Sequence, residues 1–367
     1  MAPVPEFSSP EISWFTGDNQ NSDAILKRKI AQMILVGFRG TELDPDSSLY
    51  RDIAELGIGG VILYDLDLNF RDEPRNISSK EQVTRLTEDL QNAAVFTLFI
   101  AIDQEGGHVN RLRCEYGFPP NLSAKEMSAS RKLTKAQAEE TAALLAEMGI
   151  NLNFAPCVDL DLNPDNPVIG YYERSFSANP EKVIRHAAIW IDAHRSRGIL
   201  SCIKHFPGHG SSSGDTHLGW VDVTSLWQEK ELYPYQRLIG SKNADSPVLV
   251  MTGHVYNEKL DPQYPATLSH AIITGILRNK LKYNGIVVSD DMEMAAIKEN
   301  YSFEEALEKA INAGVDILCL SNNSTEYNPD LAQNTLNAIY TLVQEGKITE
   351  SRIEESWERI VTAKQQL

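Results

Sequence analysis

Cysteine is scarce in this sequence, and long apolar runs are missing. The four cysteines among 367 residues form no Cys-x-x-Cys pair, and three of them lie within apolar runs. This pattern indicates buried free thiols and a reducing compartment rather than a disulfide framework. No apolar run approaches the ~18 residues of a membrane-spanning helix, and the first residues lack the basic and apolar regions of a signal peptide. We therefore expect a cytoplasmic protein, or a periplasmic or secreted one if a signal has been trimmed.

Basic residues are also in short supply. Lys and Arg number 34 against 51 Asp and Glu, which gives a net charge of −17 and a pI of about 4.9. Such a charge disfavours nucleic acid and anionic membrane surfaces as partners. The sequence contains neither a GxGxxG nor a GxxxxGK[ST] motif, so it indicates no nucleotide site. We expect no cofactor, no nucleic-acid partner, no membrane span and a monomer.

Short apolar, β-branched runs alternate with segments of helical periodicity. The segments with helical periodicity are 79–94, 135–149, 180–198, 271–285, 302–314 and a closing one at 348–367. The predicted strands are 33–38, 60–64, 97–103, 150–156, 199–205, 248–254, 285–290 and 316–321. Apolar strands separated by helices favour a parallel sheet, and eight repeats favour a closed barrel. The sequence predicts an α/β protein, a single-domain (β/α)8 TIM barrel over residues 23–367, preceded by an irregular segment at 1–22.

Chemically capable side chains gather where the predicted strands end. Four strand ends carry them: Asp103-Gln104-Glu105, Lys204-His205, His254 and Asp290-Asp291. In a barrel the active site is built from this carboxyl-terminal rim. The alternative is that polar residues simply begin where strands stop. We expect a shared pocket at the rim.

The stretch KHFPGHGSSSGDTH, residues 204–217, allows two chemical interpretations. His205 and His209 have the spacing of a zinc-binding helix, but the Pro and Gly between them would break such a helix, so we expect no metal. Asp215 and His217 are two residues apart, which lets the carboxylate fix the tautomer of the imidazole and raise its basicity. The Gly/Ser-rich run 208–214 suits a mobile loop. An ordinary surface loop with solvated polar groups remains the alternative.

Three further motifs carry polar groups toward the same rim. Asp290 ends the apolar run GIVVS and suits a nucleophile toward an anomeric carbon, although a helix N-cap formed by Ser289 or Asp291 is the alternative. In IDQEGGHVNRLR, Asp103 with Arg111 and Arg113 can bind sugar hydroxyls or form an internal salt bridge. Arg174, in YYERSFSANP, is an isolated Arg in a predicted loop and by itself does not indicate a function.

Together these motifs resemble glycoside hydrolase family 3, and specifically its bacterial cytoplasmic β-N-acetylglucosaminidases that trim peptidoglycan fragments. IDQEGG, ERSF, KHFPGHG followed by D-x-H, LDPQYPATLS and VVSDD occur in the family's order, from about residue 28 to 365. Two features depart from the pattern: His108 stands where the family often has Arg, and residues 218–221 are unlike common members. Both lie outside the matched catalytic positions.

The resemblance implies a retaining glycoside hydrolase that removes non-reducing terminal β-linked N-acetylglucosamine, here from peptidoglycan (muropeptide) fragments, through a covalent glycosyl-enzyme intermediate. It implies that Asp290 is the nucleophile, His217 the general acid/base and Asp215 its partner. The positions that match the family's binding residues for the non-reducing sugar are Asp103, Arg111, Arg174, Lys204 and His205.

Four alternatives remain open on sequence. A β-glucosidase or β-xylosidase of the same family would share KHF but lack the D-x-H dyad. A phosphorylase is possible because a neutral His217 leaves room for an anionic acceptor. An inactive sugar-binding barrel is disfavoured by the retained Asp290, Asp215 and His217. A metal-dependent barrel hydrolase is the weakest alternative.

Overall fold

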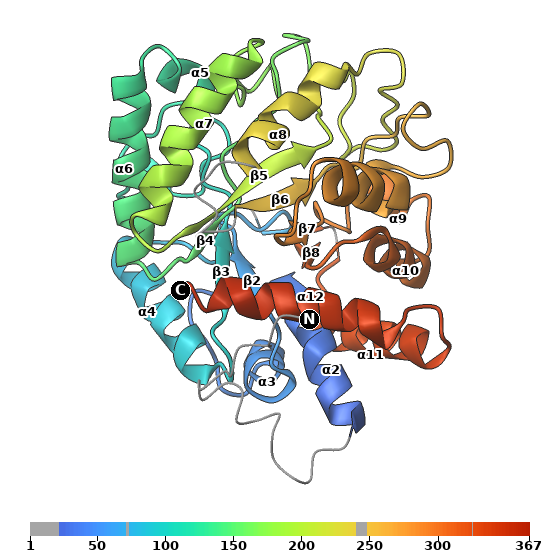
Figure 1. The fold of residues 1–367 in the computed structure, drawn as a ribbon. Coiled ribbons are helices and arrows are strands. Elements are labelled where there is room, and N and C mark those ends of the chain that lie inside the picture. The colour runs from blue at the N-terminus through green and yellow to red at the C-terminus, as the bar shows by residue number, and fades with distance from the viewer. Residues whose placement is uncertain (1–21, 71–72, 240–247, 325) are drawn as a thin grey trace, which may run out of the picture.

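The computed structural model describes residues 22–70, 73–239, 248–324 and 326–367. These residues form a ring of parallel strands wrapped by helices, as Figure 1 shows. The predicted irregular segment, residues 1–22, lies outside the described residues apart from Ser22, which opens the first described helix.

The described residues form eight strands in the order β7-β6-β5-β4-β3-β2-β1-β8. A parallel bridge between Val288 and Ile317 joins the two ends of this order and closes the ring. The predicted (β/α)8 barrel is therefore confirmed. The strands are β1 Ile34–Gly37, β2 Gly60–Leu63, β3 Phe99–Ile102, β4 Leu152–Asn153, β5 Leu200–Phe206, β6 Leu249–Thr252, β7 Val287–Val288 and β8 Leu318–Leu320.

Helices cover the outside of this ring. The longer ones are α2 Ser22–Gln32, α4 Lys80–Ala93, α6 Arg131–Glu147, α7 Pro180–Arg195, η5 Ala271–Lys280, α10 Phe303–Ala313, α11 Leu331–Gln344 and α12 Glu350–Lys364. The shorter ones are α3 Ser48–Arg51, η1 Asp52–Leu56, η2 Cys114–Tyr116, α5 Ala124–Met127, η3 Glu229–Leu232, α8 Tyr233–Ile239, η4 Ala266–Leu268 and α9 Ala295–Lys298. All six predicted helices are present, although α6 begins four residues earlier than predicted and η5 ends five residues before its predicted limit. Within the described ranges no helix is long and apolar enough to cross a membrane.

Side-chain caps explain why several helices start where they do. The N-cap hydroxyls of Ser79, Ser130, Ser302 and Thr349 each accept a hydrogen bond from a backbone N–H in the first turn of α4, α6, α10 and α12. These bonds satisfy donors that have no partner inside the helix. The strands themselves are buried along their whole length. Three of the four free cysteines are buried, as predicted, and Cys114 is exposed.

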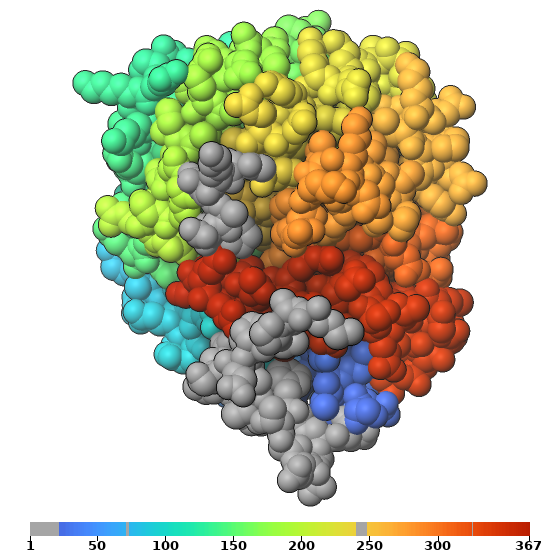
Figure 2. Space-filling model, in the orientation of Figure 1, coloured from blue at the N-terminus to red at the C-terminus, as the bar shows by residue number. Residues whose placement is uncertain are grey.

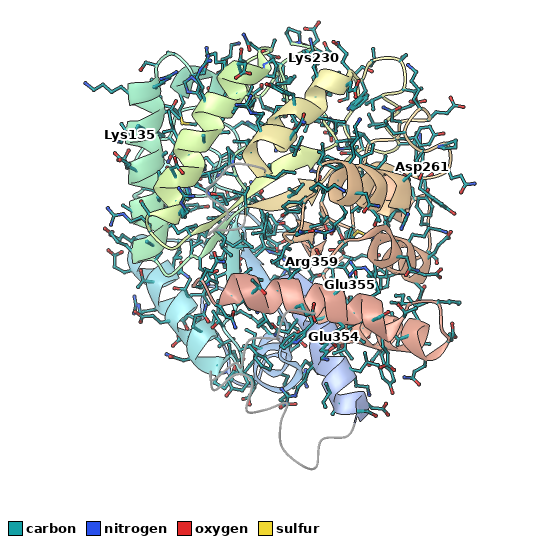
Figure 3. The ribbon with its side chains drawn as sticks, in the orientation of Figure 1. Lys135, Lys230, Asp261, Glu354, Glu355 and Arg359 are labelled. Carbon is teal, nitrogen blue, oxygen red and sulfur yellow. The ribbon has the colours of Figure 1, made fainter. Side chains whose placement is uncertain are left out.

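The buried carboxylate of Asp316 connects the junction of β7 and β8 to the helices η5 and α12. Asp316, which is 0% exposed, accepts the Val287 N–H at 2.9 Å. It also pairs with Arg278 at 2.5 Å and with Arg352 and Arg359 of α12 at 3.2 and 2.9 Å. Figure 3 labels Arg359 on α12, and Figure 2 shows α12, in red, crossing the face of the molecule above α2, in blue. The cluster therefore couples barrel closure to helix docking.

Replacing Asp316 with Ala is expected to lower the free energy of unfolding by about 3–5 kcal/mol, because it leaves buried guanidinium groups without their counter-charge. Denaturant unfolding measures this change. Glu140→Ala is the control, since Glu140 is an exposed carboxylate on α6, and it is expected to cost about 0.5 kcal/mol or less. Equal stabilities of the two variants would contradict the role of the cluster.

Candidate active site

A cavity of about 120 Å³ opens at the carboxyl ends of the strands. Its lining contains every predicted site residue except Asp215, which pairs with His217. Asp103 follows β3, Lys204 and His205 belong to β5, and Asp290 follows β7. The full lining is Ile62, Tyr64, Asp103, Val109, Arg111, Phe154, Arg174, Lys204, His205, His217, Met251, Asp290, Asp291 and Cys319. The structure thus brings together predicted site residues that lie up to 187 positions apart in the sequence, from Asp103 to Asp290.

A buried ion cluster forms one wall of the cavity. The Lys204 Nζ lies 2.6 Å from Asp103 Oδ1 and 2.7 Å from Glu105 Oε1. Arg174 binds both oxygens of Glu105, at 2.9 and 2.7 Å. Burial alone would raise the pKa of Glu105, but the charges of Arg174 and Lys204 hold it well below its usual range. Burial likewise opposes the charge on Lys204, yet the adjacent carboxylates raise its pKa.

The sequence did not identify Glu105 as a site residue. It stands in the IDQEGG motif, but nothing in the motif shows which of its polar side chains turns inward. The structure makes Glu105 the common partner of two predicted sugar-binding cations, Lys204 and Arg174. Because Glu105 already binds both cations, Asp103 is the carboxylate of this cluster that stays partly open to the cavity, with its side chain 16% exposed.

A second buried carboxylate, Asp159, orients His205. Its Oδ2 accepts hydrogen bonds from the His205 ring Nδ1 at 2.7 Å and from the His205 backbone N–H at 3.1 Å. Its Oδ1 accepts the His209 N–H at 2.8 Å. The ring Nδ1 of His205 therefore carries a hydrogen, and its Nε2 is an acceptor that lies 3.3 Å from Arg174 Nη2. Asp159 was not singled out in the sequence, because its partner is 46 residues away.

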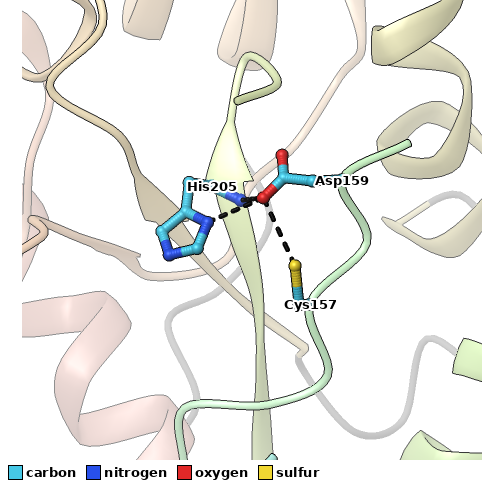
Figure 4. Close-up of side chains that lie close together, drawn as sticks. All are labelled: Cys157, Asp159 and His205. Carbon is cyan, nitrogen blue, oxygen red and sulfur yellow. Dashed lines mark hydrogen bonds and ion pairs between the residues drawn. The ribbon is translucent and has the colours of Figure 1, made fainter. Parts of the chain in front are cut away.

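The side chains of Cys157, Asp159 and His205 lie close together, as Figure 4 shows. One possible ligand atom from each lies within 4.8 Å of the other two. Their bonding does not favour a metal, because the Asp159 oxygens already accept several hydrogen bonds and burial raises the pKa of the Cys157 thiol well above its usual value. His205 and His209 do not converge either. Their ring centroids are 6.0 Å apart, and the His209 Nδ1 pairs with the Ser212 hydroxyl at 2.8 Å.

Asp290 is held as a carboxylate at the end of β7. Its backbone N–H donates to Thr252 O at 3.1 Å, and its Oδ1 accepts the Asp291 N–H at 2.9 Å. Burial would raise the pKa of Asp290, but the nearby imidazoles of His205, His254 and His217 lower it to about 2. The group is therefore ionised throughout the neutral range, as a nucleophile must be.

The neighbouring carboxylate has a structural role. Asp291 Oδ1 accepts the Ser321 and Glu293 N–H groups at 3.0 and 3.1 Å. The alternative that Ser289 or Asp291 caps a helix at Met292 is wrong, because α9 begins at Ala295. His254, noted at the rim, does not line the cavity. Its Nε2 donates to Asp291 O at 2.9 Å.

His217 and Asp215 form the predicted dyad. The His217 Nδ1 lies 2.7 Å from Asp215 Oδ1, which also accepts the His217 backbone N–H at 2.8 Å. Partial burial would lower the pKa of His217, but the Asp215 hydrogen bond and the charges of Asp290 and Asp215 raise it above its usual value. With Nδ1 bound to Asp215, Nε2 remains for proton transfer. The His217 side chain is 60% exposed.

The loop that carries this dyad is fixed at its start. Gly208–Ser212 are buried, and Asn166 Nδ2 donates to His209 O at 2.7 Å and to Ser212 Oγ at 2.9 Å. Burial and these two hydrogen bonds restrain the first five residues of the run 208–214, and the mobility of the loop stays a prediction. Exposure begins at Ser213.

Arg111 reaches the cavity from the loop after β3, on the side of Tyr64. Its guanidinium lies 3.8 Å from Asp103, 3.7 Å from Asp65 and 5.4 Å from the Tyr64 ring centroid. Asp65 also pairs with Arg113. The internal Asp103–Arg111 salt bridge, which the sequence left as the alternative to sugar binding, is thus present but long. The loop after β2, which supplies Tyr64 and Asp65, was not recognised in the sequence.

The arrangement combines a buried nucleophilic carboxylate, an exposed imidazole of raised pKa and a wall of fixed polar groups. A carboxylate and a proton donor on the same small cavity can open an acetal in two steps. The polar wall can bind the hydroxyls of one sugar ring through charge-assisted hydrogen bonds.

Comparisons with known proteins point the same way. The glycosyl hydrolase family 3 N-terminal domain matches residues 25–363. Beta-hexosaminidase A of Pseudoalteromonas piscicida is 36% identical over 304 residues, which cover 76% of this chain and 48% of that protein. A beta-hexosaminidase of Tolumonas auensis is 35% identical over 296 residues, which cover 79% of this chain and 83% of that one.

Solved structures share the architecture. The glycoside hydrolase family 3 beta-N-acetylglucosaminidase from Paenibacillus sp. str. FPU-7 matches with a TM-score of 0.81 at 34% sequence identity, covering 93% of this chain and 62% of that one. The chain thus spans about half the length of the Pseudoalteromonas relative and less than two thirds of the Paenibacillus protein.

Asp215→Asn is expected to lower the pKa of His217, because it removes the negative charge and the strong acceptor on Nδ1 that stabilise the imidazolium. A proton NMR titration of the His217 ring measures the shift. Asp222→Asn is the matched control, since Asp222 is an exposed carboxylate of the same loop that accepts the Thr224 N–H at 2.8 Å. An unchanged His217 pKa in Asp215→Asn would show that the dyad does not set it.

Proposed function

This chain belongs to glycosyl hydrolase family 3, and from that premise we propose that it is a retaining β-N-acetylglucosaminidase that removes terminal β-linked N-acetylglucosamine. The observation that carries the proposal is one small cavity lined by an ionised Asp290 and by His217, whose ring is paired with Asp215. The choice of sugar is supported by the beta-hexosaminidase and beta-N-acetylglucosaminidase names of the relatives.

The first step forms a covalent glycosyl-enzyme. Asp290 attacks the anomeric carbon while protonated His217 donates from Nε2 to the leaving oxygen. The Asp291 N–H, 2.9 Å from Asp290 Oδ1, fixes the carboxylate so that its other oxygen can attack. The sugar is held by Asp103, Lys204 and Arg174, whose positions the Glu105 cluster determines.

The second step releases the sugar and needs the opposite protonation state. Neutral His217 removes a proton from water, which attacks the anomeric carbon and frees Asp290. A histidine suits both steps because its pKa lies near neutral pH. The raised pKa of His217 keeps the acid form populated near neutrality, so the rate of the first step is expected to fall as pH rises through that pKa.

We also propose that the leaving group comes from peptidoglycan fragments. This part of the proposal is supported by the motif order that resembles the muropeptide-trimming enzymes, and the chemistry of the cavity itself is compatible with any β-linked N-acetylglucosaminide. The peptidoglycan proposal is therefore tested separately from the choice of sugar.

His217→Ala is expected to slow substrates with poor leaving groups far more than activated aryl glycosides, because only poor leaving groups need a proton in the first step. Steady-state rates for an alkyl and a dinitrophenyl N-acetylglucosaminide measure the difference, with about 10²–10⁴-fold loss on the alkyl substrate. Equal losses on both substrates would argue against the acid role.

A substrate panel tests the sugar and the acceptor. Aryl N-acetylglucosaminide is expected to be hydrolysed well ahead of aryl glucoside and aryl xyloside, and added phosphate is expected to leave the product as free sugar. A glucoside or xyloside preference would favour the related β-glucosidase or β-xylosidase activity, and a sugar phosphate would establish phosphorolysis. Comparing a muropeptide with chitobiose tests the peptidoglycan proposal. Binding without turnover of any member would identify a sugar-binding protein.

A further inference from the structure

The cavity accounts for one sugar ring and leaves the rest of the substrate outside. Its volume of about 120 Å³ is far below the ~300–1,000 Å³ of pockets that enclose drug-sized ligands. The group that departs must start beside His217, because the acid donates its proton to the oxygen that joins the two parts of the substrate. The surface next to His217 is therefore where the departing group lies.

That surface includes an apolar patch. Leu218, the next residue, is 82% exposed, and Trp220 is 43% exposed. A single exposed Leu needs no explanation, but an exposed Leu and an exposed Trp within three residues of the proton donor form a patch at a defined place. Three residues of chain span at most about 10 Å, so a ring bound beside His217 lies within reach of both side chains.

Backbone hydrogen bonds and ring packing fix the position of this patch. The exposed arch 217–220 is anchored at one end, where Thr216 O accepts the Ala296 N–H at 3.2 Å, and at the other, where Val221 O accepts the Tyr256 N–H at 2.8 Å. The Trp220 ring packs on Tyr256 with centroids 5.0 Å apart and a tilt of 40°. The Tyr256 hydroxyl donates to Pro262 O at 3.0 Å. Loops from β5 and β6 thus present the indole jointly.

We propose that Trp220 and Leu218, supported by Tyr256, form the subsite that receives the leaving-group sugar, by packing against the apolar C–H face of its pyranose ring. The inference rests on the proposed function, since it takes His217 as the proton donor. An indole offers a large, rigid apolar surface that loses little side-chain entropy on binding.

The shared chemistry is a pyranose ring in the leaving position, and two sources can supply it: a second N-acetylglucosamine, as in chitobiose, or the muramic-acid ring of a muropeptide. Both present ring C–H groups to an indole. They differ in charge, since the muropeptide carries carboxylates, whereas the neighbouring exposed side chains include Asp222 and Glu258.

The test compares leaving groups with and without a ring. For wild type, Trp220→Ala and Trp220→Phe, kcat/KM is measured on chitobiose, on a muropeptide disaccharide and on N-acetylglucosaminyl β-fluoride, whose leaving group is a single ion. The ratio of kcat/KM for disaccharide over fluoride is expected to fall about tenfold in Trp220→Ala and to be largely retained in Trp220→Phe. Leu226→Ala, at a 39% exposed position further along the loop, is expected to leave the ratio unchanged.

The outcomes separate the two proposals. If the ratio falls for one disaccharide alone, that disaccharide is the source of the leaving sugar. If it falls for both, the subsite binds the pyranose ring that the two disaccharides share. Turnover of the fluoride with an unchanged ratio in Trp220→Ala overturns the subsite and leaves the proposed function standing. Failure of the wild type to turn over the fluoride contradicts the proposed function, and the subsite with it. Thermal unfolding of each variant confirms that the loop still folds.

Discussion

The pairing of two buried cations with one carboxylate is the constraint on which the rest of the site depends. Lys204 and Arg174 come from different strand ends, and neither can remain charged in the barrel interior without a counter-ion. Glu105 supplies it to both, at 2.7 Å from each. The cluster therefore fixes the relative positions of β3, β5 and the loop after β4, and it does so before any substrate binds.

This pairing also determines what is left for the substrate. The Lys204 ammonium has three donors, of which Glu105 and Asp103 occupy two. The third is free to donate to a hydroxyl, and the half-buried Asp103 can accept from another. On the other side, the Asp159 carboxylate keeps the hydrogen of His205 on Nδ1, so Nε2 remains an acceptor toward the cavity. The polar wall is thus preorganised for a ring rich in hydroxyl groups.

The proposed nucleophile and the proposed proton donor are held in contrasting ways. Asp290 sits at a strand end, bonded through its backbone to β6, in a field of imidazoles that keeps it ionised. His217 sits on an exposed arch and depends on Asp215 for its tautomer and its raised pKa. A fixed attacking group suits bond formation at one carbon. An accessible imidazole suits a group that must meet first the leaving oxygen and then water.

Much of the fold could be predicted because all eight apolar runs became barrel strands, buried along their whole length. The helix α11 was missed, since Asp330 at its N-cap makes no side-chain capping bond and its Asn and β-branched residues weaken the helical signal. In the site, Asp290 and the Asp215–His217 pair carry local spacing that chemistry can interpret. Glu105 and Asp159 could not be assigned roles, because their partners are 69 to 99 and 46 residues away, respectively.

The central claim is that Asp290 forms a covalent bond to the sugar, and trapping that intermediate tests it most directly. A fluorinated N-acetylglucosaminyl fluoride slows release of the glycosyl-enzyme, because fluorine destabilises the positively charged transition state. Mass spectrometry of the digested protein is predicted to show one added sugar on the peptide containing VVSDD, attached to Asp290. A label on Asp291, or on any residue outside this peptide, would contradict the account.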